Sequence, residues 1–220
     1  MEFSAAHKIV AIDGPAASGK SSVAQELARR LGFVYVNSGA MYRTMTWYVL
    51  ERGIAADDAT AIEQSAQRAT ITCHLRDHDS LMLIDGVDAG PFLREDRVNE
   101  NVSRVSSVPR VREILVEHLR RYALTNDLVM EGRDIGSVVF PETPFKFYID
   151  ASPEIRARRR EGQGQRDRIA ARDLADSSRR ASPLIIAEDA HVIDSSGLTI
   201  DGVVGEIIGR LKLKGLTVAY

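Results

Sequence analysis

Short runs of consecutive apolar residues alternate along the chain with longer stretches in which apolar residues recur at every third or fourth position. Runs of the first kind are typical of strands buried on both faces, and stretches of the second kind are typical of helices with one face in the core. The first strand is predicted at residues 9–12 and the first helix at residues 21–31, where Gly32 ends it. Strands that alternate with helices in this way predict an α/β fold with a doubly wound parallel sheet.

The same pattern continues through the rest of the chain. Further strands are predicted at 33–36, 128–130, 145–149 and 192–193, and further helices at about 58–69, 94–105, 108–124 and 200–213. Another helix follows residue 36; Asn37 or Ser38 could cap it, and Gly53 ends it. Two β-like runs, 71–75 and 81–84, are joined by turn-forming residues and predict a hairpin. Because helices flank this hairpin on both sides, we expect it to be a small insert on the α/β core.

Composition narrows the class of protein. The 220 residues are enough for one α/β domain with an insert, and 44% hydrophobic with 27% charged residues is ordinary for a soluble globular protein. A net charge of −2 argues against a general nucleic-acid binder, and no apolar run is long enough to cross a membrane. Residues 1–8 lack the apolar core of a secretory signal, and the single cysteine, Cys73, excludes internal disulfides. We expect a cytoplasmic enzyme, a monomer, without nucleic-acid or membrane partners.

Residues 14–21 read Gly-Pro-Ala-Ala-Ser-Gly-Lys-Ser and match the phosphate-binding loop pattern G-x-x-x-x-G-K-[ST]. The strand predicted before the loop and the helix predicted after it are the setting that this pattern requires, which argues against a chance match by a glycine-rich turn. The N–H groups of the loop and the start of the helix would face a polyphosphate. Lys20 would contact the terminal phosphates, and the Ser21 hydroxyl would help to hold Mg²⁺. The chain is therefore predicted to bind a nucleoside triphosphate.

Residues 156–180 differ in composition from the rest of the chain. They hold nine arginines, no lysine and four acidic residues, for a local charge of +5. Arginine without lysine suits fork-shaped contacts with phosphate, and Gly162 and Gly164 could act as pivots of a mobile flap. For any single arginine, a place on a solvated helix face with exposed ion pairs is an equally good interpretation.

A small kinase needs more than a phosphate-binding loop. It also needs an acceptor pocket and positive charge over the transferred group, because phosphoryl transfer depends on positioning and charge neutralisation. Residues 38–43 and 131–136 each follow a predicted strand, at the ends where open α/β sheets bind ligands. Arg172, Asp176 and Arg179 lie in the arginine-rich segment and could supply the charge.

Four blocks of sequence point to one family. They are residues 12–21, residues 37–43 (Asn-Ser-Gly-Ala-Met-Tyr-Arg), Ser103 with residues 109–112, and residues 131–141, which begin Glu-Gly-Arg-Asp-Ile-Gly. In order and spacing they resemble the bacterial-type cytidylate kinases, which are P-loop nucleoside monophosphate kinases, and the resemblance covers residues 9–211. It implies a single domain over residues 1–220 with a core similar to that of adenylate kinase. It also implies a β-containing monophosphate-binding insert at about 38–125 and a short arginine-rich lid at about 153–181.

The resemblance also implies a role for each matched residue. ATP would be held by Gly14, Pro15, Ala16, Ala17, Ser18, Gly19, Lys20, Ser21 and Ser22. The CMP phosphate would pair with Arg43 and Arg133, beside Ser38; the cytosine would be contacted by Ser103, Arg112 and Asp134; and the ribose side would be contacted by Arg172 and Asp176, with Arg179 at the phosphates. Lys20, Arg133 and Arg179 would act in catalysis by stabilising charge on the transferred group.

The chemistry of cytosine suits contacts with Ser103, Arg112 and Asp134. A carboxylate such as Asp134 can accept from the amino group of cytosine, while Arg112 and Ser103 can donate to N3 and O2. Uracil would place a carbonyl against that carboxylate, and mismatched buried polar groups discriminate strongly. Asp134 could instead form an ion pair with Arg133 or serve as a turn carboxylate, and Ser103 could be an ordinary helix serine.

The sequence departs from the family pattern at three places. Asn37 stands where most members have Asp, Glu131 replaces the usual Asp, and the segment between Arg160 and Arg172 is short. The shortening leaves the alignment of arginines 156–160 open.

The function predicted from these residues is a (d)CMP kinase that uses ATP and Mg²⁺ and transfers the phosphoryl group directly in line. Kinases for UMP, AMP or shikimate are the alternatives within the same class. A nucleotide-dependent switch or RNA-binding module is a rival from another class. It is disfavoured because the chain lacks a guanine-reading Asn-Lys-x-Asp motif and has few aromatic residues near the arginines.

Overall fold

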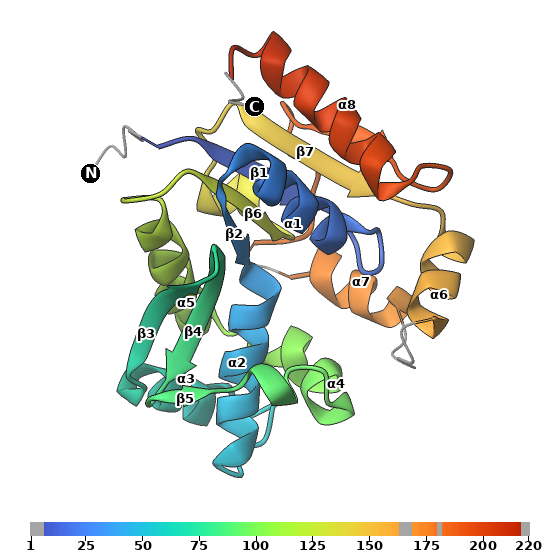
Figure 1. Ribbon diagram of the computed structural model, residues 1–220. Coiled ribbons are helices and arrows are strands. Elements are labelled where there is room, and N and C mark those ends of the chain that lie inside the picture. Colours follow the sequence, from blue (N-terminus) through green and yellow to red (C-terminus); the bar gives the residue numbers. More distant parts are fainter. Residues whose placement is uncertain (1–6, 163–168, 180–181, 217–220) are drawn as a thin grey trace.

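A computed structural model describes residues 7–162, 169–179 and 182–216, with only the backbone described at 169–172 (Figure 1). The strands are β1 Ile9–Asp13, β2 Val34–Asn37, β3 Ile71–Arg76, β4 Asp79–Ile84, β5 Val87–Asp88, β6 Leu128–Gly132, β7 Phe145–Asp150 and β8 His191–Asp194. The helices are α1 Lys20–Leu31, α2 Ser38–Glu51, α3 Ala59–Arg68, α4 Asp96–Val105, α5 Pro109–Tyr122, α6 Pro153–Glu161, α7 Ile169–Ser177 and α8 Ile200–Leu213.

The strands form one sheet in the order β3-β4-β2-β6-β1-β7-β8, with β5 paired to β4. From β2 to β8 all neighbours are parallel, and β1 lies between β6 and β7. The predicted doubly wound parallel sheet is thus confirmed. The predicted hairpin is present as β3 and β4, and it joins the main sheet because β4 pairs in parallel with β2 at Tyr35 and Asp79.

Helices cover both faces of the sheet, which explains why its central strands are mostly apolar. Ala11 of β1 points into a cluster with residues of α2, α3 and α5, while its neighbours Val10 and Ile12 point into a second cluster with residues of α1 and α8. Both clusters are closely packed, with Leu115 and Leu27 among their fully buried members. Alternation along each strand therefore serves two cores, one on each face.

The fold brings the carboxyl ends of β1, β2 and β6 to the same edge of the sheet (Figure 1). The phosphate-loop pattern follows β1, α2 follows β2, and the Gly132-Arg133-Asp134 segment follows β6. Asn37 caps α2, because its side chain accepts a hydrogen bond from the N–H of Ala40. Three segments that are far apart in the sequence thus meet where ligands of such sheets bind.

Some elements go beyond the sequence prediction. The arginine-rich segment contains two helices, α6 and α7; Gly162 follows α6, whereas Gly164 lies outside the described residues. A π-helical turn, Ile135–Val139, follows β6, where no element was predicted.

No helix in the described parts of the chain is both long and apolar enough to cross a membrane.

Candidate active site

The loop after β1 is tightly folded and closely packed. Gly14 has no room for a side chain, since a Cβ there would lie 2.1 Å from the carbonyl oxygen of Ile149. Gly19 has φ +88°, a left-handed conformation that favours glycine, and α1 begins at the next residue. Lys20 is buried and its Nζ donates to the carbonyl of Pro15 at 3.0 Å. The Oγ of Ser18 is also buried, without a hydrogen-bond partner among the described residues. These are the features of a preformed anion site.

A carboxylate stands directly beside this loop. The hydroxyl of Ser21 donates to Oε1 of Glu131 at 2.8 Å, and the hydroxyl of Tyr35 lies 3.3 Å from the same oxygen. Glu131 is only 3% exposed. A hydroxyl and a carboxylate are oxygen ligands of the kind that Mg²⁺ prefers. Glu131 was absent from the candidate site residues, although an acidic residue at the end of a strand beside β1 was a signal that could have found it.

At the other end of the site, a charged pair is buried. Arg112 of α5 forms an ion pair with Asp134, and their side chains are 5% and 4% exposed. Asp134 is thus paired with Arg112 rather than with Arg133. The guanidinium of Arg112 lies 5.1 Å from the ring centre of Tyr42, whose hydroxyl is buried without a partner among the described residues. Tyr42, like Glu131, was not among the candidate residues.

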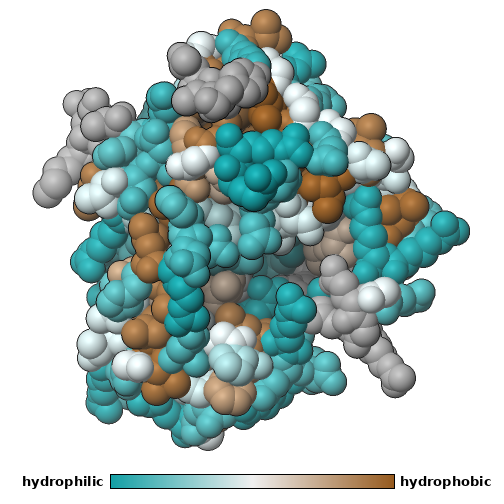
Figure 2. All heavy atoms as spheres, in the orientation of Figure 1, coloured by the Kyte–Doolittle hydropathy of each residue, from teal (hydrophilic) through white to brown (hydrophobic). Residues whose placement is uncertain are grey.

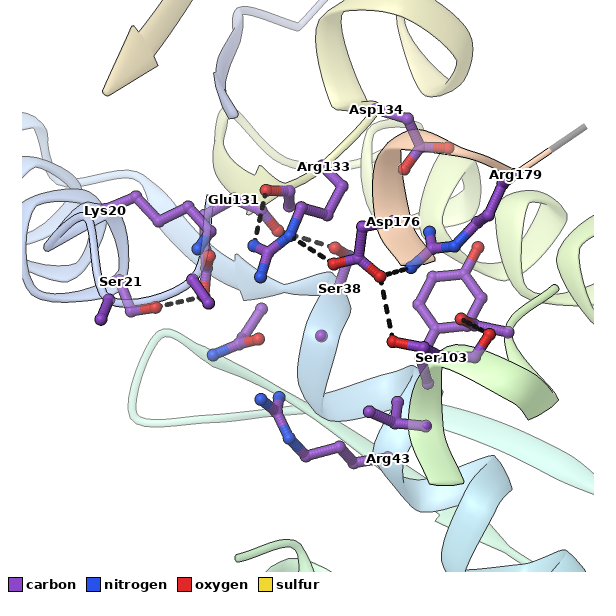
Figure 3. A pocket seen from close by; sticks show the side chains of 18 of the residues that line it. Lys20, Ser21, Ser38, Arg43, Ser103, Glu131, Arg133, Asp134, Asp176 and Arg179 are labelled. Atoms are coloured by element: carbon purple, nitrogen blue, oxygen red, sulfur yellow. Dashed lines mark hydrogen bonds and ion pairs between the residues drawn. The ribbon is translucent and has the colours of Figure 1, made fainter. Parts of the chain in front are cut away.

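Between these ends, Asp176 of α7 gathers three of the predicted residues (Figure 3). One oxygen accepts from Ser103 at 3.1 Å and pairs with Arg179, and the other accepts from Nε of Arg133 at 2.9 Å. Asp176 is 2% exposed. Ser103 is therefore more than an ordinary helix serine, because it links α4 to α7.

Residues of α2 complete another side of the site. Ser38 donates to the backbone carbonyl of Glu131 at 2.8 Å, and Gly132 allows this close approach, since a Cβ there would lie 2.5 Å from the Ser38 hydroxyl. Arg43 lies one turn further along α2, and its Nε is 3.4 Å from Asn99. Figure 3 shows Arg43 entering the site from the side opposite Asp134.

One cavity joins these groups. It is lined from the phosphate loop by Ala16, Ala17, Gly19, Lys20, Ser21 and Ser22, and from the other elements by Ser38, Arg43, Ser103, Arg112, Arg133, Asp134, Asp176 and Arg179. Figure 2 shows the surface hollowed between the part that carries α2 and α4 and the part that carries α1. Of the remaining predicted residues, Gly14, Pro15 and Ser18 belong to the loop but do not line the cavity, and the side chain of Arg172 lies outside the described residues.

Comparisons with known proteins agree with this site. The family model for cytidylate kinase matches residues 10–213. The chain belongs to the cytidylate kinase family. It is 44% identical to the cytidylate kinase of Desulforamulus reducens over 213 residues, which span 92% of this chain and 96% of the relative. It is also 44% identical to that of Mycobacterium leprae over 216 residues, 93% of this chain and 95% of the relative. The resemblance stated from the motifs is therefore confirmed, and the protein is a kinase of this family.

A solved structure from Chloroflexus aurantiacus supports the fold alone. It superimposes with a TM-score of 0.50 at 16% sequence identity and covers 96% of this chain and 98% of its own.

In this member of the cytidylate kinase family, arginines of α6 contact the phosphate loop directly. Arg159 donates to the carbonyl of Ser18 at 3.1 Å, and Arg156 donates to that of Ala16 at 3.3 Å. Arg156 is also paired with Asp173 of α7, which accepts the N–H of Ala16 at 3.0 Å. The alternative that these two arginines lie on a solvated helix face with exposed ion pairs is therefore wrong.

Burial shifts the proton affinity of groups at this edge of the sheet. It raises the pKa of Asp13 to about 7, although the N–H groups of Ile135 and Gly136 donate to this carboxyl and lower its pKa. Burial likewise raises the pKa values of Tyr35 and Tyr42, so both hydroxyls stay protonated at neutral pH. These two tyrosines can therefore donate hydrogen bonds under working conditions.

Proposed function

We propose that this protein transfers the γ-phosphoryl group of ATP to CMP, and to dCMP, by direct in-line transfer, giving ADP and CDP or dCDP. The observation that carries the proposal is the buried pair of Arg112 and Asp134, at one end of a cavity that begins at the phosphate loop. A paired donor and acceptor at that place match the edge of cytosine. The protein does not need to supply a covalent nucleophile, because positioning and charge neutralisation suffice for phosphoryl transfer.

The donor would be held by the loop from Gly14 to Ser22. Its backbone N–H groups and the first turn of α1 would surround the ATP phosphates, and the buried Lys20 would neutralise the terminal ones. Arg133 and Arg179, which already share Asp176, would stabilise charge on the transferred group. Lys20 begins α1, Arg133 follows β6 and Arg179 follows α7, so three separate segments would bring positive charge to the transferred group.

Mg²⁺ fits the corner beside the loop, where Ser21 and Glu131 lie 2.8 Å apart. Those two residues would hold the ion through oxygen ligands. When bound, it would neutralise charge on the ATP phosphates.

The acceptor would lie between α2, α4 and α7. Arg43 and Arg133 would pair with the CMP phosphate beside Ser38, and Ser103, Arg112 and Asp134 would contact the base. Asp176 and Arg172 would contact the ribose. Uracil would set a carbonyl against the Asp134 carboxylate, so UMP should be a poor acceptor.

Initial rates with ATP and Mg²⁺ held constant would test the proposal. CMP and dCMP should be phosphorylated, UMP, AMP and shikimate should react at least roughly a hundredfold more slowly, and chelation of Mg²⁺ should stop the reaction. Lys20→Ala should lower turnover by roughly a thousandfold with an unchanged circular dichroism spectrum, because one preorganised charge is removed. Lys214→Ala, an exposed lysine that contacts the carbonyl of Pro144, is the matched control. Equal rates with CMP and UMP would overturn the assignment.

We further propose that the enzyme works as a monomer in the cytoplasm. A mass near 24.3 kDa in light scattering would agree with the first part.

A further inference from the structure

Asn37 uses both ends of its side-chain amide. Oδ1 accepts from the N–H of Ala40 at 2.9 Å and caps α2, and Nδ2 donates to the hydroxyl of Tyr35 at 3.1 Å. The cap fixes which end is which, because a reversed amide would set its NH₂ group against the N–H of Ala40. The amide of Asn37 must therefore present a donor to Tyr35.

The register of the sheet explains why these groups meet. Tyr35 and Asn37 are two residues apart on β2, so their side chains lie on the same face. Asn37 is opposite Glu131 in the parallel pairing of β2 with β6. Tyr35 and Val129 both belong to the apolar cluster beneath α1, so this face looks toward the first turn of α1, where Ser21 lies.

The hydrogen bonds consequently form a chain in which Asn37 donates to Tyr35 and Tyr35 donates to Glu131. Tyr35 accepts from Asn37, which leaves its own O–H free to donate to Oε1 of Glu131 at 3.3 Å. The same oxygen accepts from Ser21 at 2.8 Å. Tyr35 is 9% and Glu131 3% exposed, so water has little access to replace the bond between them. A buried carboxylate held by two hydroxyl donors has a defined orientation.

We infer that Asn37 is a positioning residue: through the hydroxyl of Tyr35 it holds the Glu131 carboxylate in place beside Ser21, at the Mg²⁺ corner of the active site. This inference rests on the proposed function, since it assigns a role to residues behind the metal corner.

The chemistry of residue 37 follows from this arrangement. Aspartate would still cap α2 but would offer Tyr35 only acceptors, so two carboxylates would compete for one hydroxyl. It would also place a second negative charge beside Glu131. Serine would keep a cap and leave Tyr35 without its donor. Both changes should loosen Glu131 while leaving the base-binding residues untouched.

Binding of Mn²⁺, measured by electron paramagnetic resonance in the presence of adenylyl imidodiphosphate, tests this role without turnover. Asn37→Ser, Asn37→Asp and Tyr35→Phe should each weaken Mn²⁺ binding roughly tenfold, as loss of partners behind a metal ligand usually does. The double variant Asn37→Ser with Tyr35→Phe should bind no more weakly than either single variant, because both interrupt one chain. The KM for CMP should stay within about twofold.

Asp58→Ala is the matched control, because it removes the N-terminal cap of α3 away from the site. It should lower stability and leave Mn²⁺ binding unchanged. Unchanged or tighter Mn²⁺ binding in the Asn37 variants would overturn the inference. It would also be overturned if the double variant bound Mn²⁺ more weakly than both single variants, or if Asp58→Ala weakened Mn²⁺ binding. Failure of the wild-type protein to bind Mn²⁺ with the ATP analogue would instead remove the proposed function, and this inference with it.

Discussion

Asp134 and Arg112 are charged residues whose burial is compensated by each other. Removal of one partner leaves the other charge buried and unpaired, which costs about 2–5 kcal/mol at a binding site. Asp134→Ala should therefore raise the KM for CMP by roughly a hundredfold or more, whereas the KM for ATP should change less than about threefold. Initial-rate measurements with each substrate varied in turn check this. If both constants rose equally, Asp134 would not belong to the base-binding site.

Asp13 predicts a pH dependence of stability. Its pKa is about 7 in the folded protein against 3.8 for an ordinary aspartate, so the folded state holds the proton more tightly. The stabilisation is complete below about pH 4 and is lost as pH rises through about 7. Relative to Asp13→Asn, the wild-type free energy of unfolding should fall by up to about 1.4 kcal/mol per pH unit in that range. Urea titrations at several pH values measure it.

The exposed Asp57 supplies the comparison for this titration. Asp57→Asn should follow the wild-type curve, because it is a substitution at an exposed position and leaves Asp13 in place. A constant difference between wild type and Asp13→Asn from pH 4 to pH 8 would contradict the prediction.

At the scale of elements, the side chain of Asp173 ties α7 to the phosphate loop. Asp173 accepts the N–H of Ala16 and pairs with Arg156 of α6, so it joins two helices to the loop. Asp173→Ala should increase hydrogen exchange in α7 and raise the KM for ATP several-fold, because the loop loses a backbone partner. Leu174→Ala, at a 70% exposed position on the same helix, should leave both unchanged. Equal exchange in the two variants would show that Asp173 does not hold α7 to the loop.

At the scale of the whole molecule, the site is assembled from the segments that follow β1, β2 and β6 and from the helices around them. Ligands that bridge these parts should stabilise the entire fold. At a concentration about a hundred times its Kd, CMP should contribute about 2.7 kcal/mol and raise Tm by roughly 5–10 °C. UMP at the same concentration should raise Tm less, because its base mismatches Asp134 and Arg112. Differential scanning fluorimetry compares the two, and equal shifts would argue against base recognition by this pair.

The sequence by itself determined most of the elements and the phosphate-loop pattern. Short, mostly apolar runs are typical of strands covered on both faces, so β1, β6 and β7 were predictable from the local pattern. The loop from Gly14 to Ser21 was equally local, because its pattern needs only a strand before it and a helix after it. The motifs around Ser38, Arg133 and Asp134 were visible too, and with them the family.

Only the tertiary structure decided which of these residues touch. Arg112 pairs with Asp134 across 22 positions, and Ser103 with Asp176 across 73. Such pairs depend on strand order and register, which set neighbours that no local pattern specifies. The same holds for Glu131, whose place beside Ser21, 110 positions away, follows from the pairing of β6 with β1. Burial then selects among the possible partners, because an unpaired polar group inside the protein is costly, and this selection exists only once the chain is folded.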